Sequence, residues 1–499
     1  MKASRPQQLH IVFADSPEGA VRAEEADVSA AEASMAHPAA CSQRAESTSR
    51  GAADTSRLLE LVASEENLVL ALENVASNDG APGVDGVSVK EVVAHAARLR
   101  PLLRRALLSE SFVPGDIRRV WIDKSGGGQR GLGIPNVIDR WVQRAVLQIL
   151  EPLYEPTFHP SSHGFRPKRG AHTAIAEAAV YVTRGRPVTV DIDLSKFFDR
   201  VNHQRLLDRM AQRIADRRIL RFVRLMLTAS VVMPDGVRVA TEEGTPQGGP
   251  LSPLLSNIVL DELDQELARR RLRFVRYADD CNIYVRSERA GRRVMASIRR
   301  FIEGRLRLKV NEEKSAVDLA RHRHFLGFRV GATRKQRPVV QLSQRSFERL
   351  DAKLRALTPR TWGRSLEACF AGLASYMQGW MGYFRLCTRE VHDTLEYFDC
   401  HVRRRLRAII VRQKKRPRHL YRHLRRHGSS SPSAHKAAYS SRGAWWQSQS
   451  GALEYVHDND WFAARMPSLL ALWKAQHHDW RSLGLRPEEP DVRSTCPVP

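Results

Sequence analysis

Alternating and helically spaced hydrophobic residues divide much of this chain into short strands and amphipathic helices. Apolar positions within 58–75, 137–153, 254–267 and 294–306 recur every three to four residues, as on one face of a helix. Residues 117–135 alternate, pass through a run of glycines and alternate again, which predicts a β-hairpin. Helices are therefore expected to be interspersed with short strands.

One apolar run, residues 274–285, is interrupted in its middle by two adjacent carboxylates, Asp279 and Asp280. Its β-branched and aromatic residues favour strands and its Ala-Asp-Asp-Cys favours a turn, so the pattern predicts a hairpin with acids at its tip. Neighbouring aspartates repel each other unless a cation lies between them. Mg²⁺, which prefers carboxylate, water and phosphate oxygens, meets that need. The alternative is a solvated turn, because Asp-Asp is common in turns.

A second acidic strand lies upstream, in residues 187–202. Asp191 and Asp193 are two positions apart, so on a strand both side chains point the same way. Asp193 stands where the strand pattern gives way to Leu-Ser-Lys-Phe-Phe. If this strand neighbours the acidic hairpin, the carboxylates could hold two metal ions side by side, the arrangement used for in-line attack at phosphorus.

These motifs resemble those of a known family. The Tyr-Ala-Asp-Asp ending at Asp280, with Asp193 and the aromatic Phe198 five residues after it, is similar to the palm active site of reverse transcriptases. More narrowly, the chain resembles the bacterial group II intron-encoded reverse transcriptase/maturase. The resemblance implies an α+β fold with right-hand polymerase architecture, in which fingers and a palm with an antiparallel sheet precede a helical thumb/maturase domain. It implies catalytic and Mg²⁺-ligating roles for the carboxylates of Asp193, Asp279 and Asp280, and a ligand role for the backbone carbonyl of Leu194.

The hairpin predicted at 117–135 carries basic residues on both arms, which are expected to gather at one end. We interpret it as the fingertip that holds the incoming triphosphate through Arg118, Lys124 and Arg130. Read alone, the same pattern fits an exposed hairpin with solvated charges. It is not a Walker loop, because no Gly-Lys-Ser/Thr follows at the required spacing.

The resemblance assigns three further residues to the nucleotide site. Phe198 would pack beneath the sugar of the incoming dNTP and leave no room for a 2′-hydroxyl, although ordinary core is the alternative for either phenylalanine of this pair. Gln247, in a Pro-Gln-Gly turn, would lie beside the nascent base pair. Lys314 would lie near the leaving pyrophosphate, or would pair with one of the two glutamates before it, the commoner fate of a lysine.

Residues 401–426 carry twelve cations and no acidic residue, more than a solvated helix face needs. Interleaved aromatic residues such as Tyr421 can stack on bases. Gly-Trp-x-x-Tyr-Phe at 379–384 and Arg-Leu-Arg at 405–407 resemble the family's thumb and maturase region, which implies a grip on intron RNA and template–primer duplex through phosphates. The residues expected to contact template or RNA are Arg166, in a Gly-Phe-Arg-Pro-x-Arg block, and Arg403, Arg404, Arg405, Arg407, Arg412, Lys414 and Lys415.

Composition supports a nucleic-acid partner. The 499-residue chain has a net charge of +25 and a pI near 10.4, so an extended polyanion is the natural partner. An anionic membrane is the rival explanation, but no run of about 18 apolar residues appears. The six cysteines form no C-x-x-C pair, which argues against a zinc site or a disulfide framework. We therefore expect a cytoplasmic, nucleoid-associated protein with no membrane partner.

Five segments are expected along the chain. Residues 1–56 hold five basic and eight acidic residues, a net charge of −3 that leaves +28 on the remainder, and read as a disordered tail. Residues 57–335 are expected to form the reverse transcriptase fingers and palm, and 336–428 the helical thumb/maturase domain. A serine-rich linker signal opens 429–484, a small nucleic-acid-contacting region, and 485–499 is a loose tail.

The leading hypothesis is an RNA-directed DNA polymerase that copies intron RNA into DNA by two-metal nucleotidyl transfer and binds that RNA to assist splicing and mobility. Its expected partners are group II intron RNA, a template–primer duplex, a DNA target and dNTPs. A homodimer is one possible oligomeric state. The first alternative is a host-defence or retron-type reverse transcriptase, against which the long maturase-like region argues. The second is a splicing-only RNA-binding maturase, against which the intact carboxylate set argues.

Overall fold

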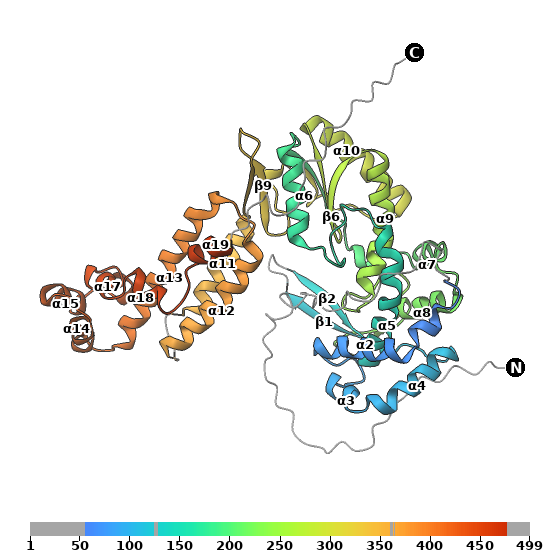
Figure 1. The fold of residues 1–499 in the computed structure, drawn as a ribbon, viewed down its shortest axis with the longest axis horizontal. Helices are drawn as coiled ribbons and strands as arrows, with labels where there is room; N and C mark the ends of the chain where they lie inside the picture. The colour runs from blue at the N-terminus through green and yellow to red at the C-terminus, as the bar shows by residue number, and fades with distance from the viewer. Residues whose placement is uncertain (1–54, 124–127, 360–362, 364, 477–499) are drawn as a thin grey trace, which may run out of the picture. The chain divides into compact units, whose positions relative to one another are not determined.

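The computed structural model describes residues 55–123, 128–359, 363 and 365–476 (Figure 1). It contains helices and small sheets, which is the mixed content expected from the sequence. The chain divides into two compact units: the first holds residues up to Pro160, Leu194–Glu266 and Arg300–Asn311, and the second holds the rest. Within the described ranges, no helix is both long enough and apolar enough to cross a membrane.

The first unit is mainly helical and carries one small sheet of order β2-β1-β4-β5. β1 and β2 form the hairpin predicted at 117–135, and β4 joins β1 in parallel. The strands are β1 (Ile117–Asp123), β2 (Gln129–Ile134), β4 (Val231–Val232) and β5 (Arg238–Val239). The helices are α1 (Leu58–Val62), α2 (Glu65–Ser77), α3 (Val89–Ala94), α4 (Ala96–Leu108), α5 (Val137–Tyr154), α7 (His203–Ala211), α8 (Arg217–Leu227) and most of α9 (Ser252–Arg269), with short turns at Glu155–Thr157, Phe197–Asp199 and Ile302–Leu306.

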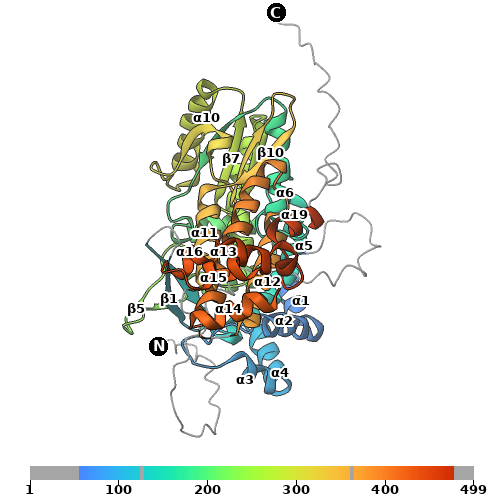
Figure 2. The ribbon, with the colours of Figure 1, turned by 90° about the vertical axis from the view of Figure 1, so that its left-hand side faces the viewer.

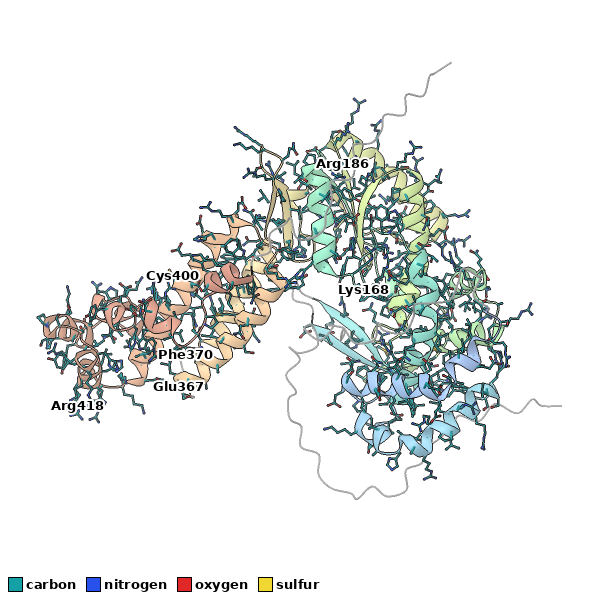
Figure 3. All side chains as sticks on the ribbon, viewed as in Figure 1. Lys168, Arg186, Glu367, Phe370, Cys400 and Arg418 are labelled. Atoms are coloured by element: carbon teal, nitrogen blue, oxygen red, sulfur yellow. The ribbon has the colours of Figure 1, made fainter. Side chains whose placement is uncertain are left out.

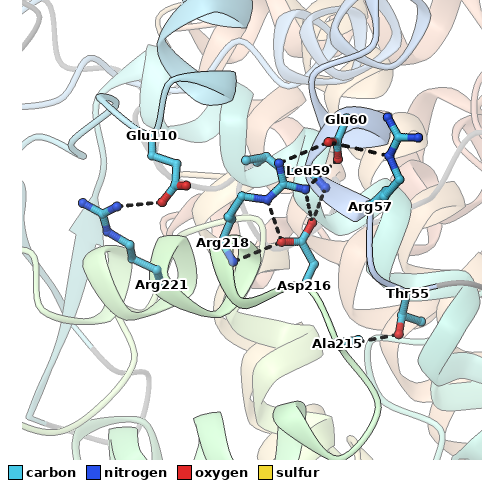
Figure 4. Close-up of polar contacts among 9 residues, drawn as sticks. All are labelled: Thr55, Arg57, Leu59, Glu60, Glu110, Ala215, Asp216, Arg218 and Arg221. Carbon is cyan, nitrogen blue, oxygen red and sulfur yellow. Dashed lines mark hydrogen bonds and ion pairs between the residues drawn. The ribbon is translucent and has the colours of Figure 1, made fainter.

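A network of charged side chains around the buried Asp216 fastens α1 to α8 (Figure 4). Asp216 caps α8 by accepting a hydrogen bond from the backbone N of Arg218, and it also accepts one from the backbone N of Leu59 in α1, both at 3.0 Å. The Arg218 guanidinium donates in turn to Glu60 Oε2 at 2.7 Å. Because Asp216 is only 3% exposed, these bonds supply the compensation that a buried carboxylate requires. The first described helix is thereby held against the unit.

The second unit is built on an antiparallel sheet of order β6-β7-β3-β8. In Figure 2 this sheet lies between α6 (Ala171–Thr183) and α10 (Glu288–Phe301). Gly291 of α10 approaches the sheet so closely that a Cβ there would press on the Val317 side chain. Alanines of α6 pack with Val275 and Tyr284 on the opposite face. The strands are β3 (Val188–Ile192), β6 (Arg273–Tyr277), β7 (Asp280–Val285) and β8 (Ala316–Leu319).

A helical region follows within the same unit. The β9–β10 hairpin packs with α6 and with four later helices around one hydrophobic cluster that includes Phe328 and Phe398. These elements are β9 (Phe328–Ala332), β10 (Pro338–Leu342), α11 (Gln344–Leu357), α12 (Leu366–Phe384), α13 (His392–Gln413) and α19 (Leu469–Gln476), with turns at Ala320–His322 and Arg389–Val391.

A second, smaller cluster joins α14 (Pro417–Arg426), α15 (Ser431–Ala438) and α17 (Gly451–Val456), and two short helices, α16 (Ala444–Gln447) and α18 (Asn459–Ala463), complete the region. The linker predicted from the serine-rich stretch is wrong. Ser429 is buried and α15 begins at Ser431 with proline in its first turn. Serine followed by proline also begins helices, and it does so here.

Candidate active site

The acidic hairpin predicted from the sequence is present. β6 and β7 pair through Tyr277 and Asp280, which leaves Ala278 and Asp279 as the two-residue turn between them. Asp279 therefore stands at the tip, and Asp280 is the first residue of β7. Both carboxylates belong to one rigid strand–turn–strand element of the second unit.

The register of β3 on β7 brings the upstream acid to this tip. The last paired residues are Ile192 and Cys281, so one further step of the antiparallel register sets Asp193 opposite Asp280. Residues opposite each other on antiparallel strands have Cα atoms about 4.5–5.5 Å apart and side chains on the same face. Three carboxylates from two distant stretches of sequence therefore converge at one end of the sheet.

The neighbouring acids affect the protonation of Asp280. The pKa of Asp280 is raised to about 7, first by desolvation and then by repulsion from Asp279, Asp191 and Asp193, against a smaller attraction to Lys314. Asp280 is exposed at the surface of the hairpin, and the acids that repel it lie on the same sheet near this tip. Within the described residues, no three His, Cys, Asp or Glu side chains are already arranged to enclose a metal ion.

Two cations balance the acids on this face. Lys314 Nζ lies 3.6 Å from Asp193 Oδ2, and Arg323 Nη2 lies 2.7 Å from Asp191 Oδ2. Burial raises the pKa of Asp191 and the Arg323 contact opposes that rise. Lys314 thus pairs with the predicted catalytic acid, whereas Glu312, offered by the sequence as its partner, pairs with Arg299.

The sequence did not single out Arg323 or Ser315, whose hydroxyl accepts a hydrogen bond from the Asp193 backbone N at 3.0 Å. Both follow Lys314 within nine residues, but neither their spacing nor the local composition identifies them as neighbours of the acids. Their roles depend on the pairing of β8 with β3, which is visible only in the fold.

The predicted nucleotide-binding residues of the first unit lie on several of its elements. Phe197 is buried at 2% exposure, while Phe198 is partly exposed and its carbonyl accepts from Thr245 N at 2.6 Å. The Gln247 carbonyl accepts a hydrogen bond from the backbone N of Gly133 in β2 at 2.7 Å. Leu194, buried at 4%, forms an isolated bridge with Val310.

The expected gathering of basic residues at one end of the β1–β2 hairpin is wrong for Arg118. Arg130 pairs opposite Ile122, four residues along β1 from Arg118, a separation of roughly 13 Å at about 3.3 Å per residue. Arg130 is near the turn, whereas Arg118 is near the open end of the hairpin. Lys124 lies outside the described residues.

The residues predicted to bind template or RNA differ in exposure. Arg166 is 5% exposed and donates to the Ser162 carbonyl at 2.8 Å. Arg407 is 9% exposed and donates to the His457 carbonyl at 2.7 Å, and Arg405 donates to the Thr358 carbonyl at 2.6 Å. The others lie at least partly at the surface: Arg403, Arg404, Arg412, Lys414 and Lys415.

Two family models match this chain. One, described as "Reverse transcriptase (RNA-dependent DNA polymerase)", matches residues 122–330, and one described as "Group II intron, maturase-specific domain" matches residues 347–428. The Escherichia coli (strain K12) protein YkfC is 35% identical over 347 residues, which cover 60% of this chain and 91% of YkfC.

The chain belongs to the group II intron reverse transcriptase/maturase family. The family predicted from the sequence is thus confirmed, as is the reverse transcriptase assignment. The maturase-specific match implies intron RNA binding, and reverse transcriptases, as nucleotidyltransferases, generally need a divalent metal ion.

Other relatives of this family share shorter stretches. The group II intron-encoded protein LtrA of Lactococcus lactis is 34% identical over 208 residues, which cover 42% of this chain and 34% of LtrA. Retron Mx65 reverse transcriptase of Myxococcus xanthus is 31% identical over 208 residues, which cover 39% of this chain and 46% of that protein. Because a maturase-specific match follows the reverse transcriptase match here, the retron-type alternative is not favoured.

Proposed function

We propose that this reverse transcriptase copies intron RNA into DNA at Asp193, Asp279 and Asp280, and that its helical region binds the same RNA to assist splicing and mobility. The observation that supports the polymerase site is the register of β3 on β7, which sets Asp193 opposite Asp280. In the right-hand architecture that we propose, the fingers belong to the first unit, the β6-β7-β3-β8 sheet is the palm and α11–α13 include the thumb.

The acids fit Mg²⁺, the metal that we propose for this site. Carboxylates of Asp193, Asp279 and Asp280, with the Leu194 carbonyl, offer the oxygen donors that a hard cation prefers. Desolvation and repulsion from the neighbouring acids raise the pKa of Asp280, and positive charge among these groups relieves the repulsion. Bound Mg²⁺ supplies activation of the primer 3′-hydroxyl and neutralisation of phosphate charge.

The chain's own side chains complete the proposed reaction. Lys314, beside Asp193, is positioned to stabilise charge on the departing pyrophosphate. Phe198 excludes a ribose, Gln247 contacts the new base pair, and basic residues of the β1–β2 hairpin hold the triphosphate. Of the predicted hairpin set, Lys124 and Arg130 are proposed for this role, and Arg118, at the open end of the hairpin, is not.

The proposed partners follow from the surface charge. Intron RNA, template–primer duplex and a DNA target are all polyanions, and the surface-lying basic residues of α13 and the turn after it match them. A cytoplasmic, nucleoid-associated location and a homodimer are part of the same proposal, the first because the template and target are found there.

Single substitutions of the acids test the proposal. We expect Asp279→Ala and Asp280→Ala each to lower primer extension on an RNA template on the order of 10²-fold or more, because each removes charge from the reacting centre. Splicing of the cognate intron RNA should be largely kept, since the helical region is unchanged. Asp208→Ala, at an exposed acid of α7, is the matched control for extension. Extension that survives in both acid variants is incompatible with the assignment.

A further inference from the structure

A fully buried arginine lies directly beneath the acidic tip. Arg276 of β6 is 0% exposed, and its guanidinium donates to the Ala278 carbonyl at 2.9 Å and to Ser162 Oγ at 2.7 Å. Burial of a guanidinium costs several kcal/mol unless its donors are satisfied. Arg276 stands three positions before Asp279 and bonds the turn residue next to it. The burial of this arginine therefore needs an explanation beyond packing.

The geometry points to a brace, formed by Arg276 and the segment 161–164, that sets the position of the Asp279 and Asp280 carboxylates. Arg276 is a positioning residue in this arrangement, because it acts through the backbone of Ala278. The inference rests on the proposed function only for what the positioned acids do, and it adds residues that the motif itself does not include.

The turn needs such support. Ala278 has φ +55°, a left-handed conformation that costs a non-glycine residue on the order of 1 kcal/mol and persists where surroundings fix it. Its carbonyl is the group held by Arg276 Nη1. Because that carbonyl belongs to the peptide joining Ala278 to Asp279, the bond fixes the plane from which the Asp279 side chain departs.

The segment 161–164 lies along the strand that carries the tip. Arg276 N donates to the Ser161 carbonyl at 2.9 Å, and His163 N donates to the Arg276 carbonyl at 2.8 Å. The segment therefore adds a short parallel bridge to β6. It then passes Ala278 at Gly164, where an added Cβ would press into the Ala278 backbone N and lie 3.2 Å from its Cα. Only glycine allows this approach.

The segment is fixed at its other side to α6. His163 Nε2 lies 2.6 Å from Glu177 Oε2, His163 Nδ1 lies 2.8 Å from Thr173 Oγ1, and Ser161 Oγ donates to Glu177 Oε1 at 2.6 Å. Burial would raise the pKa of Glu177, but hydrogen bonds from His163, Ser161 and Tyr181 outweigh it and leave the pKa below its ordinary value. A charged acceptor makes these bonds strong, so α6 serves as the rigid base of the brace.

Arg166 belongs to the same arrangement. Its guanidinium donates to the Ser162 carbonyl, beside the hydroxyl that Arg276 contacts. This placement explains why a residue predicted to touch template is buried. Its contribution to polymerisation is then made through the tip, as for Arg276.

A pair of glycine substitutions tests the brace. Gly164→Ala forces the segment and the tip apart, whereas Gly170→Ala, six residues later, adds the same methyl group where nothing lies within 4 Å. Mn²⁺ alone is titrated into each full-length protein and followed by electron paramagnetic resonance, with Asp279→Ala defining the binding that depends on the tip. We expect Gly164→Ala to weaken that binding on the order of tenfold or more, as for groups that orient metal ligands, and Gly170→Ala to match the wild type.

Steady-state primer extension gives a second measurement. Gly164→Ala should lower kcat on the order of 10–100-fold with KM for the dNTP little changed, because the reacting groups and not substrate contacts are displaced. Wild-type Mn²⁺ affinity and kcat in a folded Gly164→Ala protein overturn the brace. If that variant does not fold, Ser162→Ala, which removes one acceptor of Arg276, must show the same changes at about three- to tenfold, and wild-type behaviour there overturns it instead.

The metal titration separates this inference from the proposed function. Loss of Mn²⁺ binding in Gly164→Ala, with no primer extension by the wild type, would leave the brace standing and the polymerase proposal refuted. Primer extension by the wild type, together with unchanged Mn²⁺ binding in the variants, would leave the polymerase proposal standing and refute the brace.

Discussion

In the proposed site, sugar selection is assigned to one aromatic ring, that of Phe198. Of the two adjacent phenylalanines, Phe197 is buried and Phe198 is partly exposed, with its backbone held by Thr245. If Phe198 lies under the sugar, Phe198→Ala opens space for a 2′-hydroxyl. We expect the ratio of kcat/KM for dNTP to that for rNTP to fall on the order of 10–100-fold, the range that pocket shape alone supplies.

Two neighbouring substitutions control this experiment. Phe198→Tyr keeps the ring and should keep the discrimination. Phe197→Ala removes a buried ring and should cost about 3–5 kcal/mol of stability, with no specific change in sugar choice. Unchanged selection in Phe198→Ala would remove the gate.

Among single residues, the placement of the acids was more predictable from the sequence than the placement of the arginines. Asp193 and Asp280 stand in strand patterns whose alternation fixes which way each side chain points. Arginine carries no such information, because the same residue type serves surface and interior. Arg407 in the Arg-Leu-Arg motif is buried on the His457 carbonyl, and only tertiary packing distinguishes it from Arg403.

Among the elements, hairpins and amphipathic helices follow from local pattern, and their arrangement does not. The β6–β7 turn is set by a two-residue loop, so the sequence sufficed. β3 lies between β7 and β8 in the sheet although it is far from both in sequence, and β1 pairs in parallel with the distant β4. Local patterns do not predict such pairings. The family resemblance, not periodicity, supplied that part of the prediction.

A buried acid at the start of α5 makes a helix terminus sensitive to pH. Asp139 is 4% exposed and accepts from Gly115 N at 3.1 Å. Its pKa is raised to about 7, first by desolvation, and also by repulsion from Asp85, against the opposing Gly115 bond. Between the unfolded pKa near 4 and about 7, the folded protein keeps a proton that the unfolded chain releases. Stability from this group is therefore greatest below about pH 4 and is lost as pH rises through about 7.

Asp139→Asn tests this linkage, because an amide resembles the protonated acid. We expect the melting temperature of the variant, relative to wild type, to increase from pH 5 to pH 8, at a rate equivalent to no more than about 1.4 kcal/mol per pH unit. Thermal unfolding followed by circular dichroism at several pH values measures it. A difference that stays constant across this range would contradict the raised pKa.

For the whole molecule, charge is the dominant property. A net charge of +25 attracts any polyanion, so affinity for RNA by itself says little about where RNA binds. The distribution is more informative. On α14, Leu420 and Leu424 are buried, while Arg418, Arg422 and Arg426 are exposed four residues apart, and Figure 3 shows Arg418 at the outside of this helix. Such a row of cations on one helix face matches a phosphate backbone.

Replacing that row tests whether position or total charge governs binding. Arg418→Gln, Arg422→Gln and Arg426→Gln together should weaken binding to intron RNA and make the slope of log K against log salt shallower by about 2, because each phosphate contact contributes roughly 0.7–0.9. The matched control replaces three exposed arginines of α4, in the other unit, with glutamine: Arg98, Arg104 and Arg105.

Both triple variants lose the same charge, so an account based on net charge requires equal slopes. A localised RNA surface on α14 requires the α4 variant to keep the wild-type slope. Filter binding between about 50 and 200 mM salt distinguishes the two, since losses of this kind are large over that range. Equal slopes in the two variants would assign RNA binding to the molecule's overall field and remove α14 as a specific contact.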